Sequence, residues 1–173
     1  MIKEQIGERI ILRLISREDT KLIVAWRNNA RVRKNFIFQE QFTEEMHNHW
    51  LDTKVASGEV VQFIITIKKD GVPIGSVYFR NIDYDEKKAE YGIFIGEDTA
   101  VGKGYGTEAA ELALEYAFHV LELKKVYLRV FADNKSAIQS YLNAGFGKID
   151  YTENIVTPSG GYRKVIFMEK NIE

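Results

Sequence analysis

The stretch that decides the fold is Val101-Gly102-Lys103-Gly104-Tyr105-Gly106-Thr107, which holds three glycines in five residues. It follows a β-rich run and opens a long amphipathic segment. Glycine lets backbone N–H groups approach a ligand without a Cβ in the way. A helix N-terminus adds a partial positive charge and unpaired N–H donors. With Lys103 as a local cation, the stretch predicts a cradle for phosphate groups, although a turn that only joins a strand to a helix has the same composition.

Hydrophobic periodicity and turn signals predict the elements on both sides of this stretch. The Asp70-Gly71 pair between two β-rich runs is a strong hairpin signal. Before the stretch we expect a strand at 9–14, a helix at 17–29 and a second helix that begins at Thr43. A three-stranded antiparallel meander follows, with strands at 60–68, 72–82 and 88–96. The stretch itself opens a long helix, which is followed by a strand at 125–131 and a helix at 134–144. A last pair of strands is expected at 146–151 and 162–168. With no repeat and no linker-like segment, this order predicts one mixed α/β domain over residues 1–173.

Composition excludes several classes of function. The formal net charge is −1 over 173 residues, so no global field draws the chain to nucleic acid or to an anionic membrane. Cysteine is absent, which rules out disulfides and thiolate metal sites. Met1–Glu8 lacks the apolar stretch of a signal peptide, and no run approaches the roughly 18 apolar residues of a membrane span. We expect a cytoplasmic protein.

The three histidines are too scattered to suggest a metal site. His47 and His49 lie two residues apart and so point to different faces of a helix. We expect both to be solvated.

Two blocks of sequence resemble the GNAT superfamily of N-acetyltransferases. The segment 101–106 matches both glycines of the family signature Gln/Arg-x-x-Gly-x-Gly/Ala, but Val101 replaces the first residue and removes one side-chain contact. The second block is 134–141 followed by Gly145-Phe146. The resemblance covers nearly the whole chain. It implies an α/β (α+β) fold with a mixed, mostly antiparallel central sheet of about seven strands, flanked by about four helices.

The resemblance also implies acetyl-coenzyme A as cosubstrate, and no metal. Backbone groups of Phe94 and Ile95 would hold the pantetheine arm as an added β-like ladder. The amides of Lys103, Gly104, Tyr105, Gly106 and Thr107 would hold the pyrophosphate. Asn134 would contact the thiol end of the cofactor, and a role as a helix cap fits the sequence equally well.

Two residues are candidates for catalysis by this resemblance. Tyr141 corresponds to the tyrosine that protonates the departing thiolate, and it shares a helix side with Asn134 (141 − 134 = 7). A core aromatic is the alternative. Glu90 is the candidate base, because 104 − 90 = 14 reproduces the family spacing to the loop glycine. The alternatives are an ion-paired or surface Glu90, with an ordered water taking the proton.

The acceptor is the least determined part of the prediction. Trp26-Arg27-Asn28 resembles nucleotide-amino-sugar acetyltransferases and marks these residues as substrate-binding candidates. The basic and aromatic segment 31–42 suits a nucleotide diphosphate or is a solvated connector. The chain also resembles the acetyltransferases of ribosomal-protein N-termini and of spermidine, the latter including Gly161-Tyr162-Arg163. We expect a primary amine on a small molecule, such as a nucleotide amino sugar, with a peptide amine as an alternative.

A domain that binds acyl-coenzyme A without turnover belongs to another class of function. The presence of both Glu90 and Tyr141 disfavours it. A nucleic-acid-binding module is opposed by the charge and by the lack of a recognition-helix pattern. A homodimer or higher homo-oligomer is left open.

Overall fold

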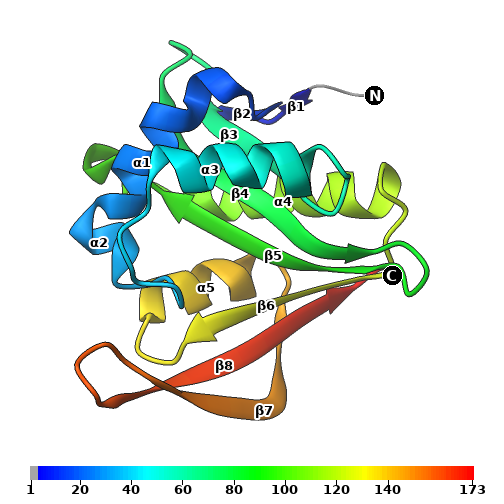
Figure 1. Cartoon of the computed structure of the whole chain (residues 1–173). Coiled ribbons are helices and arrows are strands. Elements are labelled where there is room, and N and C mark those ends of the chain that lie inside the picture. The colour runs from blue at the N-terminus through cyan, green and yellow to red at the C-terminus, as the bar shows by residue number, and fades with distance from the viewer. Residues whose placement is uncertain (1–3) are drawn as a thin grey trace.

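A computed structural model describes residues 4–173 as an eight-stranded sheet with helices on both faces (Figure 1). The strand order is β1-β2-β3-β4-β5-β6-β8-β7, and every neighbouring pair is antiparallel except β5–β6. The strands are β1 (Glu4–Ile6), β2 (Ile10–Leu14), β3 (Val61–Ile67), β4 (Pro73–Asp83), β5 (Lys88–Ile95), β6 (Lys125–Phe131), β7 (Gly147–Val156) and β8 (Tyr162–Asn171). The helices are α1 (Thr20–Asn28), α2 (Ala30–Arg33), α3 (Glu44–Trp50), α4 (Tyr105–His119) and α5 (Lys135–Asn143).

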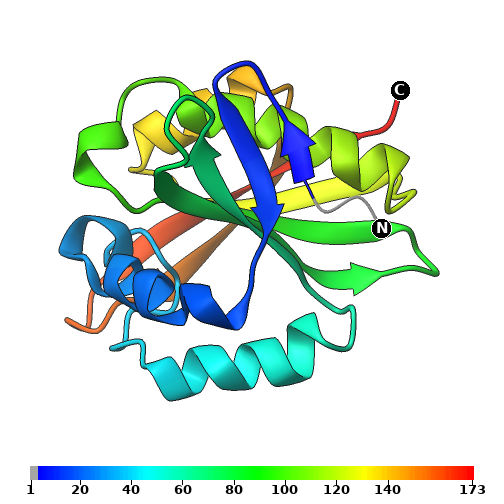
Figure 2. The same cartoon turned by 90° about the horizontal axis from the view of Figure 1, so that it is seen from above.

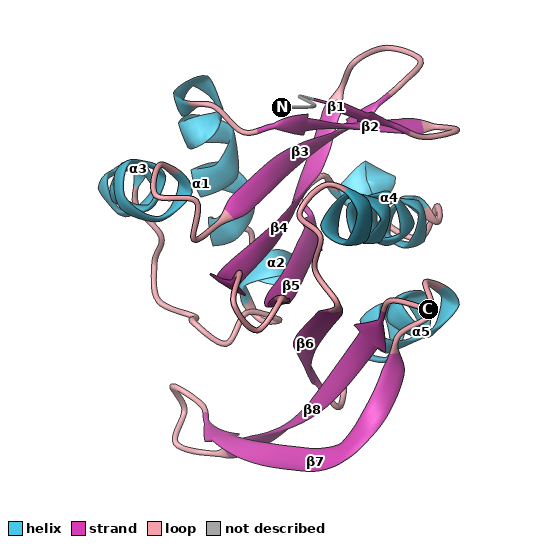
Figure 3. Ribbon diagram, turned by 90° about the vertical axis from the view of Figure 1, so that its right-hand side faces the viewer, coloured by secondary structure: helices cyan, strands magenta, loops and turns pink. Residues whose placement is uncertain are grey.

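The sheet separates two hydrophobic layers. Figures 2 and 3 show α1 and α3 on one side and α4 on the other, with α5 on the side of α4. Side chains of a strand alternate between faces, so Phe63 and Ile65 of β3 join the larger core under α4, while Ile64 packs with Trp26 and Phe94 under α1. Both faces of β3 are therefore buried. The mixed, mostly antiparallel fold predicted from sequence is confirmed.

The single parallel pair gives the sheet an opening. Strands β5 and β6 are paired at three positions, the last joining Glu90 to Tyr127. Beyond it the two strands spread apart toward their C-terminal ends (Figure 1), and within residues 4–173 the segment 91–95 has no strand partner on its β6 side. A parallel connection needs a long crossover, which α4 supplies. We call this divergence the β5–β6 opening.

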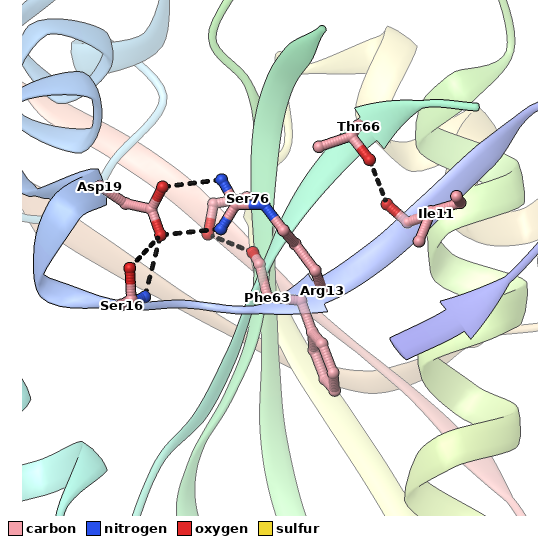
Figure 4. A network of polar contacts seen from close by, with 7 residues as sticks. All are labelled: Ile11, Arg13, Ser16, Asp19, Phe63, Thr66 and Ser76. Atoms are coloured by element: carbon pink, nitrogen blue, oxygen red, sulfur yellow. Dashed lines mark hydrogen bonds and ion pairs between the residues drawn. The ribbon is translucent and has the colours of Figure 1, made fainter. Parts of the chain in front are cut away.

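A polar network ties the start of α1 to the sheet (Figure 4). Arg13 of β2 donates two hydrogen bonds to the carboxylate of Asp19, at 2.9 and 2.8 Å. The same carboxylate accepts the backbone N–H of Ser16, which closes a capping box around a 3₁₀ turn, Arg17–Asp19. The predicted helix start at Ser16 is confirmed, and this contact fixes the direction in which α1 leaves the sheet.

Several boundaries differ from the prediction for identifiable reasons. The sheet has eight strands because Glu4–Ile6 pairs with β2; residues 1–3 of the segment Met1–Glu8 lie outside the described part. Part of the segment expected as a loop forms α2, capped by Asn29. The last hairpin is longer than expected because β7 continues to Val156. The Asp70-Gly71 turn is confirmed, with Gly71 at φ +72°. Within residues 4–173, no helix has the length and apolar character to cross a membrane.

The expectation of a solvated His47 is wrong. Helix α3 begins at Glu44, and in this helix His47 lies on the face that packs against the rest of the protein. Leu51, four residues later, is buried on the same face. His47 is buried, and its Nδ1 lies 2.9 Å from the Thr20 hydroxyl oxygen. His49 is exposed, as expected.

Candidate active site

The glycine-rich stretch forms the turn that starts α4. Gly104 is the N-cap and has φ +82°, a left-handed conformation that a residue with a Cβ rarely adopts. The helix begins at Tyr105, so the backbone N–H groups of Tyr105, Gly106 and Thr107 belong to its first turn, where N–H groups lack intrahelical acceptors. The turn therefore has the geometry of an anion cradle.

Arg9 braces this turn from the beginning of the chain. Its guanidinium donates to the carbonyl oxygen of Lys103 at 2.7 Å and to Glu108 at 3.0 Å, and it lies over the ring of Tyr105. The carboxylate of Glu108 also accepts the backbone N–H of Arg9. Sequence reasoning missed this pair, because 99 residues separate the partners and neither belongs to a motif.

The β5–β6 opening leaves one edge of β5 free next to the turn. The N–H of Gly96 donates to Ile74 of β4, so by strand alternation Phe94 also directs its backbone groups toward β4. Ile93 and Ile95 direct theirs toward the opening. Arg31 of α2 already donates to the carbonyl oxygen of Ile95 at 2.8 Å. Of the two residues predicted to bind pantetheine, only Ile95 thus faces the opening, and Phe94 instead packs its ring under α1.

Tyr141 stands at the apex of the opening. It projects from α5 and is 8% exposed. Its ring meets the ring of Tyr91, the first β5 residue beyond the last β5–β6 pair, edge-to-face with centroids 6.1 Å apart. Burial raises the pKa of Tyr141 above its usual value, and Tyr78 adds to this. Tyr141 therefore remains protonated at neutral pH, as a proton donor must.

Glu90 lies at the same apex on the opposite face of the sheet, since side chains of adjacent strand residues alternate. One carboxylate oxygen accepts hydrogen bonds from Arg80 of β4 at 2.9 Å and from Arg129 of β6 at 2.8 Å. The other oxygen accepts from Asn81 at 3.2 Å. Burial acts to raise the pKa of Glu90, but the hydrogen bonds and charges of the two arginines outweigh it and the pKa is lowered. A lowered pKa makes this carboxylate a weaker base and favours the ion-paired alternative.

In the Trp26-Arg27-Asn28 triplet, the side chains of Trp26 and Asn28 are hydrogen-bonded within the fold and that of Arg27 is not. Trp26 is buried, and its indole N–H donates to Glu97 at 2.7 Å. The Asn28 side chain donates to the carbonyl of Phe42 and accepts its N–H. Arg27 has no hydrogen bond or ion pair within residues 4–173, so none of the donors of its guanidinium is used.

Comparison with known proteins identifies the family. Residues 9–147 match the family described as an acetyltransferase (GNAT) domain. The chain belongs to the GNAT acetyltransferase family.

The most similar relatives of this GNAT chain include polyamine enzymes. Spermidine N(1)-acetyltransferase of Escherichia coli K12 is 32% identical over 158 residues, which cover 91% of this chain and 83% of that protein. The enzyme of the same name from Vibrio cholerae is 28% identical over 145 residues, 81% of this chain and 80% of that protein. A crystal structure of Vibrio cholerae spermidine N-acetyltransferase with CoA and spermine superimposes with a TM-score of 0.86, at 24% identity over 94% of this chain and 95% of that chain. This last likeness supports the fold.

As a GNAT enzyme the chain uses acetyl-coenzyme A, and its own geometry fits that molecule. The left-handed Gly104 opens the first-turn amides of α4 to a pyrophosphate, and the free edge of β5 offers peptide groups to a pantetheine arm. Val101 stands where the family signature has Gln or Arg. Its side chain is exposed and has no polar group, so it cannot make the side-chain contact of that residue. Among the described residues no group of three or more His, Asp or Glu side chains is placed to hold a metal ion.

Asn134 takes the helix-cap role that the sequence allowed. Its side-chain oxygen accepts the backbone N–H of Ala137 at 3.4 Å at the start of α5. The side-chain NH₂ makes no hydrogen bond within residues 4–173. The contact with the thiol end of the cofactor stays a prediction.

Proposed function

We propose that this enzyme acetylates a primary amine of a small molecule. The observation that carries the proposal is the β5–β6 opening, which has a protonated tyrosine on one face of its apex and a carboxylate–arginine cluster on the other. A thioester that enters along β5 reaches the apex from the side of α4. The amine approaches from the side of α1, where Glu90 lies.

The donor side is made mostly of backbone groups. The first-turn amides of Tyr105, Gly106 and Thr107 bind the pyrophosphate, with Lys103 beside them. Ile93 and Ile95 replace the predicted pair Phe94 and Ile95 as the ladder for pantetheine. When bound, acetyl-coenzyme A supplies a thioester-activated acetyl group.

Proton transfers complete the proposed reaction. Tyr141 gives its proton to the departing thiolate, which needs an acid that stays protonated at neutral pH. The amine must lose a proton, because an alkyl ammonium with a pKa near 10.4 is only about one part in two thousand neutral at pH 7. The base role predicted for Glu90 stays a prediction. The lowered pKa of Glu90 favours a role in positioning Arg80 and Arg129, with the proton passing to water.

Two acceptor classes have specific support. Spermidine is the acceptor that the similar proteins support, since the Escherichia coli relative is a spermidine N(1)-acetyltransferase and its match covers most of the chain. A nucleotide amino sugar is the acceptor predicted from the sequence, and it accounts for the unpaired Arg27, which a polyamine does not. A peptide N-terminus has no such support in the structure.

Assembly is part of the proposal. A structure of Vibrio cholerae spermidine N-acetyltransferase, 26% identical to this chain, is dodecameric. We propose a homo-oligomer for this chain as well, and light scattering of the purified protein measures it.

Thiol release from acetyl-coenzyme A, followed against a panel of polyamines, amino sugars and peptides, tests the function. Turnover of at least one amine, lost in Tyr141→Phe, is the expected result. If acetyl-coenzyme A binds in calorimetry but no amine releases thiol, the chain is a binding domain and the proposed reaction is wrong.

A further inference from the structure

Three arginines from three different elements lie on the α1 face of the sheet. Arg80 of β4 and Arg129 of β6 both bind one oxygen of Glu90. Arg27 of α1 lies over the ring of Phe36, which contacts the ring of Phe94 of β5 on the same face. Burial lowers the pKa of Arg27; Tyr78 opposes this, and the charge of Arg80 adds to it. Of this cluster, Arg80 and Arg129 sit at the apex of the β5–β6 opening, on the side from which an acceptor must approach, and Arg27 lies over β5 on the same side.

Arg27 is held in place without using its hydrogen-bond donors. Its guanidinium lies over the rings of Phe36 and Phe42, with the central carbon 3.8 and 4.4 Å from the two ring centroids. The two hydrogen bonds between Asn28 and the backbone of Phe42 fix the second ring. Stacking covers the faces of the guanidinium and leaves the N–H groups on its edge. A guanidinium fixed in this way is ready to bind an anion at little entropic cost.

The charge of the cluster is not balanced. Three guanidinium groups and one carboxylate leave two positive charges (3 − 1 = 2). The Nε–H of Arg80 is in addition buried without an acceptor. Two other arginines are neutralised: Arg31 pairs with Asp98 and Arg163 with Asp133. Arg33 of α2 donates to the backbone carbonyl of Gln39 and has no carboxylate partner within residues 4–173, so it adds to the positive charge.

A polycation finds no matching site there. A second positive charge about 4 Å from an arginine costs about 1 to 4 kcal/mol in a water-exposed to half-buried setting. A hollow that carries two carboxylates, Glu45 and Asp52, lies on the outer side of α3, away from the inward-facing His47. Asp52 is already paired with Arg17.

We infer that the acceptor of this enzyme carries an anionic group, a phosphate, a diphosphate or a carboxylate, which Arg27 binds while Arg80 and Arg129 supply the surrounding positive field. This inference rests on the proposed function and names its substrate class. The anionic group anchors the acceptor between the rings of Phe36 and Phe42 and the sheet. Its amine then extends to the apex, between Glu90 and Tyr141.

Kinetics on matched amines test the inference. We compare glucosamine, glucosamine 6-phosphate, a uridine diphosphate-linked amino sugar with a free amine, glycine and spermidine. An anionic acceptor is expected to have a KM at least about 10-fold below that of its uncharged counterpart. The member of the panel with the lowest KM identifies phosphate, diphosphate or carboxylate as the source of the charge.

Variants of α1 connect this preference to Arg27. Arg27→Gln is expected to raise the KM for the anionic acceptor about 10-fold or more, and to raise the KM for glucosamine by much less. Arg27→Lys keeps the charge and should give an intermediate value. Lys21→Gln removes an exposed charge from the same helix and is the matched control. If Arg27→Gln is poorly folded, the salt dependence of the wild-type KM replaces it, and it should be steep for the anionic amine only.

The two proposals fail differently. Turnover of amines with no preference for anionic groups, or a preference that Arg27→Gln leaves intact, overturns this inference and leaves the acetyltransferase in place. Efficient turnover of spermidine that improves in Arg27→Gln identifies a polyamine acceptor and also overturns it. No turnover of any amine refutes the proposed function itself.

Discussion

The two sides of the β5–β6 opening, the proposed donor side next to α4 and the proposed acceptor side next to α1, differ in the groups that they present. On the donor side, one continuous turn presents backbone N–H groups, and their positions follow from the conformation of Gly104. On the acceptor side, Arg27, Arg80, Glu90 and Arg129 come from four elements that are far apart in the sequence. A backbone site tolerates a change of side chain such as Val101, whereas a side-chain site changes its specificity with each substitution. A chain of this family can therefore keep its acetyl donor while the acceptor changes, and we propose an anionic acceptor here.

Tyr141, where the two sides meet, should give the largest effect. Tyr141→Phe is expected to lower kcat about 10²- to 10⁴-fold, because only the proton for the leaving thiolate is lost. Affinity for coenzyme A should stay near wild type, since the ring still packs against Tyr91 and Phe146. Thiol release and calorimetry measure the two quantities. Tyr151→Phe, on the exposed β7, is the control. A Tyr141→Phe enzyme within about twofold of wild type would demote the tyrosine to packing.

The donor side is tested by Gly104→Val. A β-branched residue at φ +82° is strained, and its Cβ would lie 3.2 Å from the guanidinium of Arg9. Strain of about 1 to 3 kcal/mol should weaken coenzyme A binding about 5- to 150-fold, as read by calorimetry. Gly147→Ala, which meets nothing within 4 Å, is the matched control. Unchanged affinity in a folded Gly104→Val protein would remove the turn from the cofactor site.

The acceptor side is tested by Glu90→Gln. Removing the carboxylate leaves Arg80 and Arg129 without their counter-charge, so we expect a loss of about 1 to 3 kcal/mol in the free energy of unfolding and a rate defect that is constant with pH. Thermal denaturation and a pH–rate profile measure these. Glu59→Gln, which removes the charge of an exposed pair with Lys54, is the control and should leave the thermal stability near that of the wild type. A defect that disappears as rising pH deprotonates the amine would instead identify Glu90 as the base.

The smallest expected effect concerns the layer beneath the acceptor side. Burial lowers the pKa of His47 to about 4, and Arg27 adds to the lowering. The unfolded chain, with a histidine pKa near 6.5, binds more protons than the folded one between these values. Stability contributed by neutral His47 is thus present above about pH 6.5 and falls as pH drops toward 4.

His47→Gln should lose part of this dependence, which denaturant titrations at pH 7, 5.5 and 4.5 would reveal. His49→Gln, exposed on the same helix, should keep it. Parallel curves for wild type and His47→Gln would place the acid-sensitive group elsewhere.

Sequence reasoning succeeded where a local pattern has one structural solution. The three glycines before an amphipathic run predicted the turn and α4, and Asp70-Gly71 predicted its hairpin, because each signal lies within a few residues of the backbone that it shapes. It missed Arg9 and placed His47 in solvent. Both depend on contacts across the fold, and in the case of His47 on where α3 begins.

The sequence by itself determined the family, the order of the elements and the glycine turn that starts α4, since hydrophobic period and glycine placement act through local sterics. Only the tertiary structure decided the direction in which Phe94 and Ile95 turn their peptide groups, the ion pairs of Glu90 and the isolation of Arg27. Each of these depends on which side chains from distant segments reach the same point. The net charge around Glu90 depends on which charged side chains lie near it, and the folded sheet brings these together from distant positions along the chain.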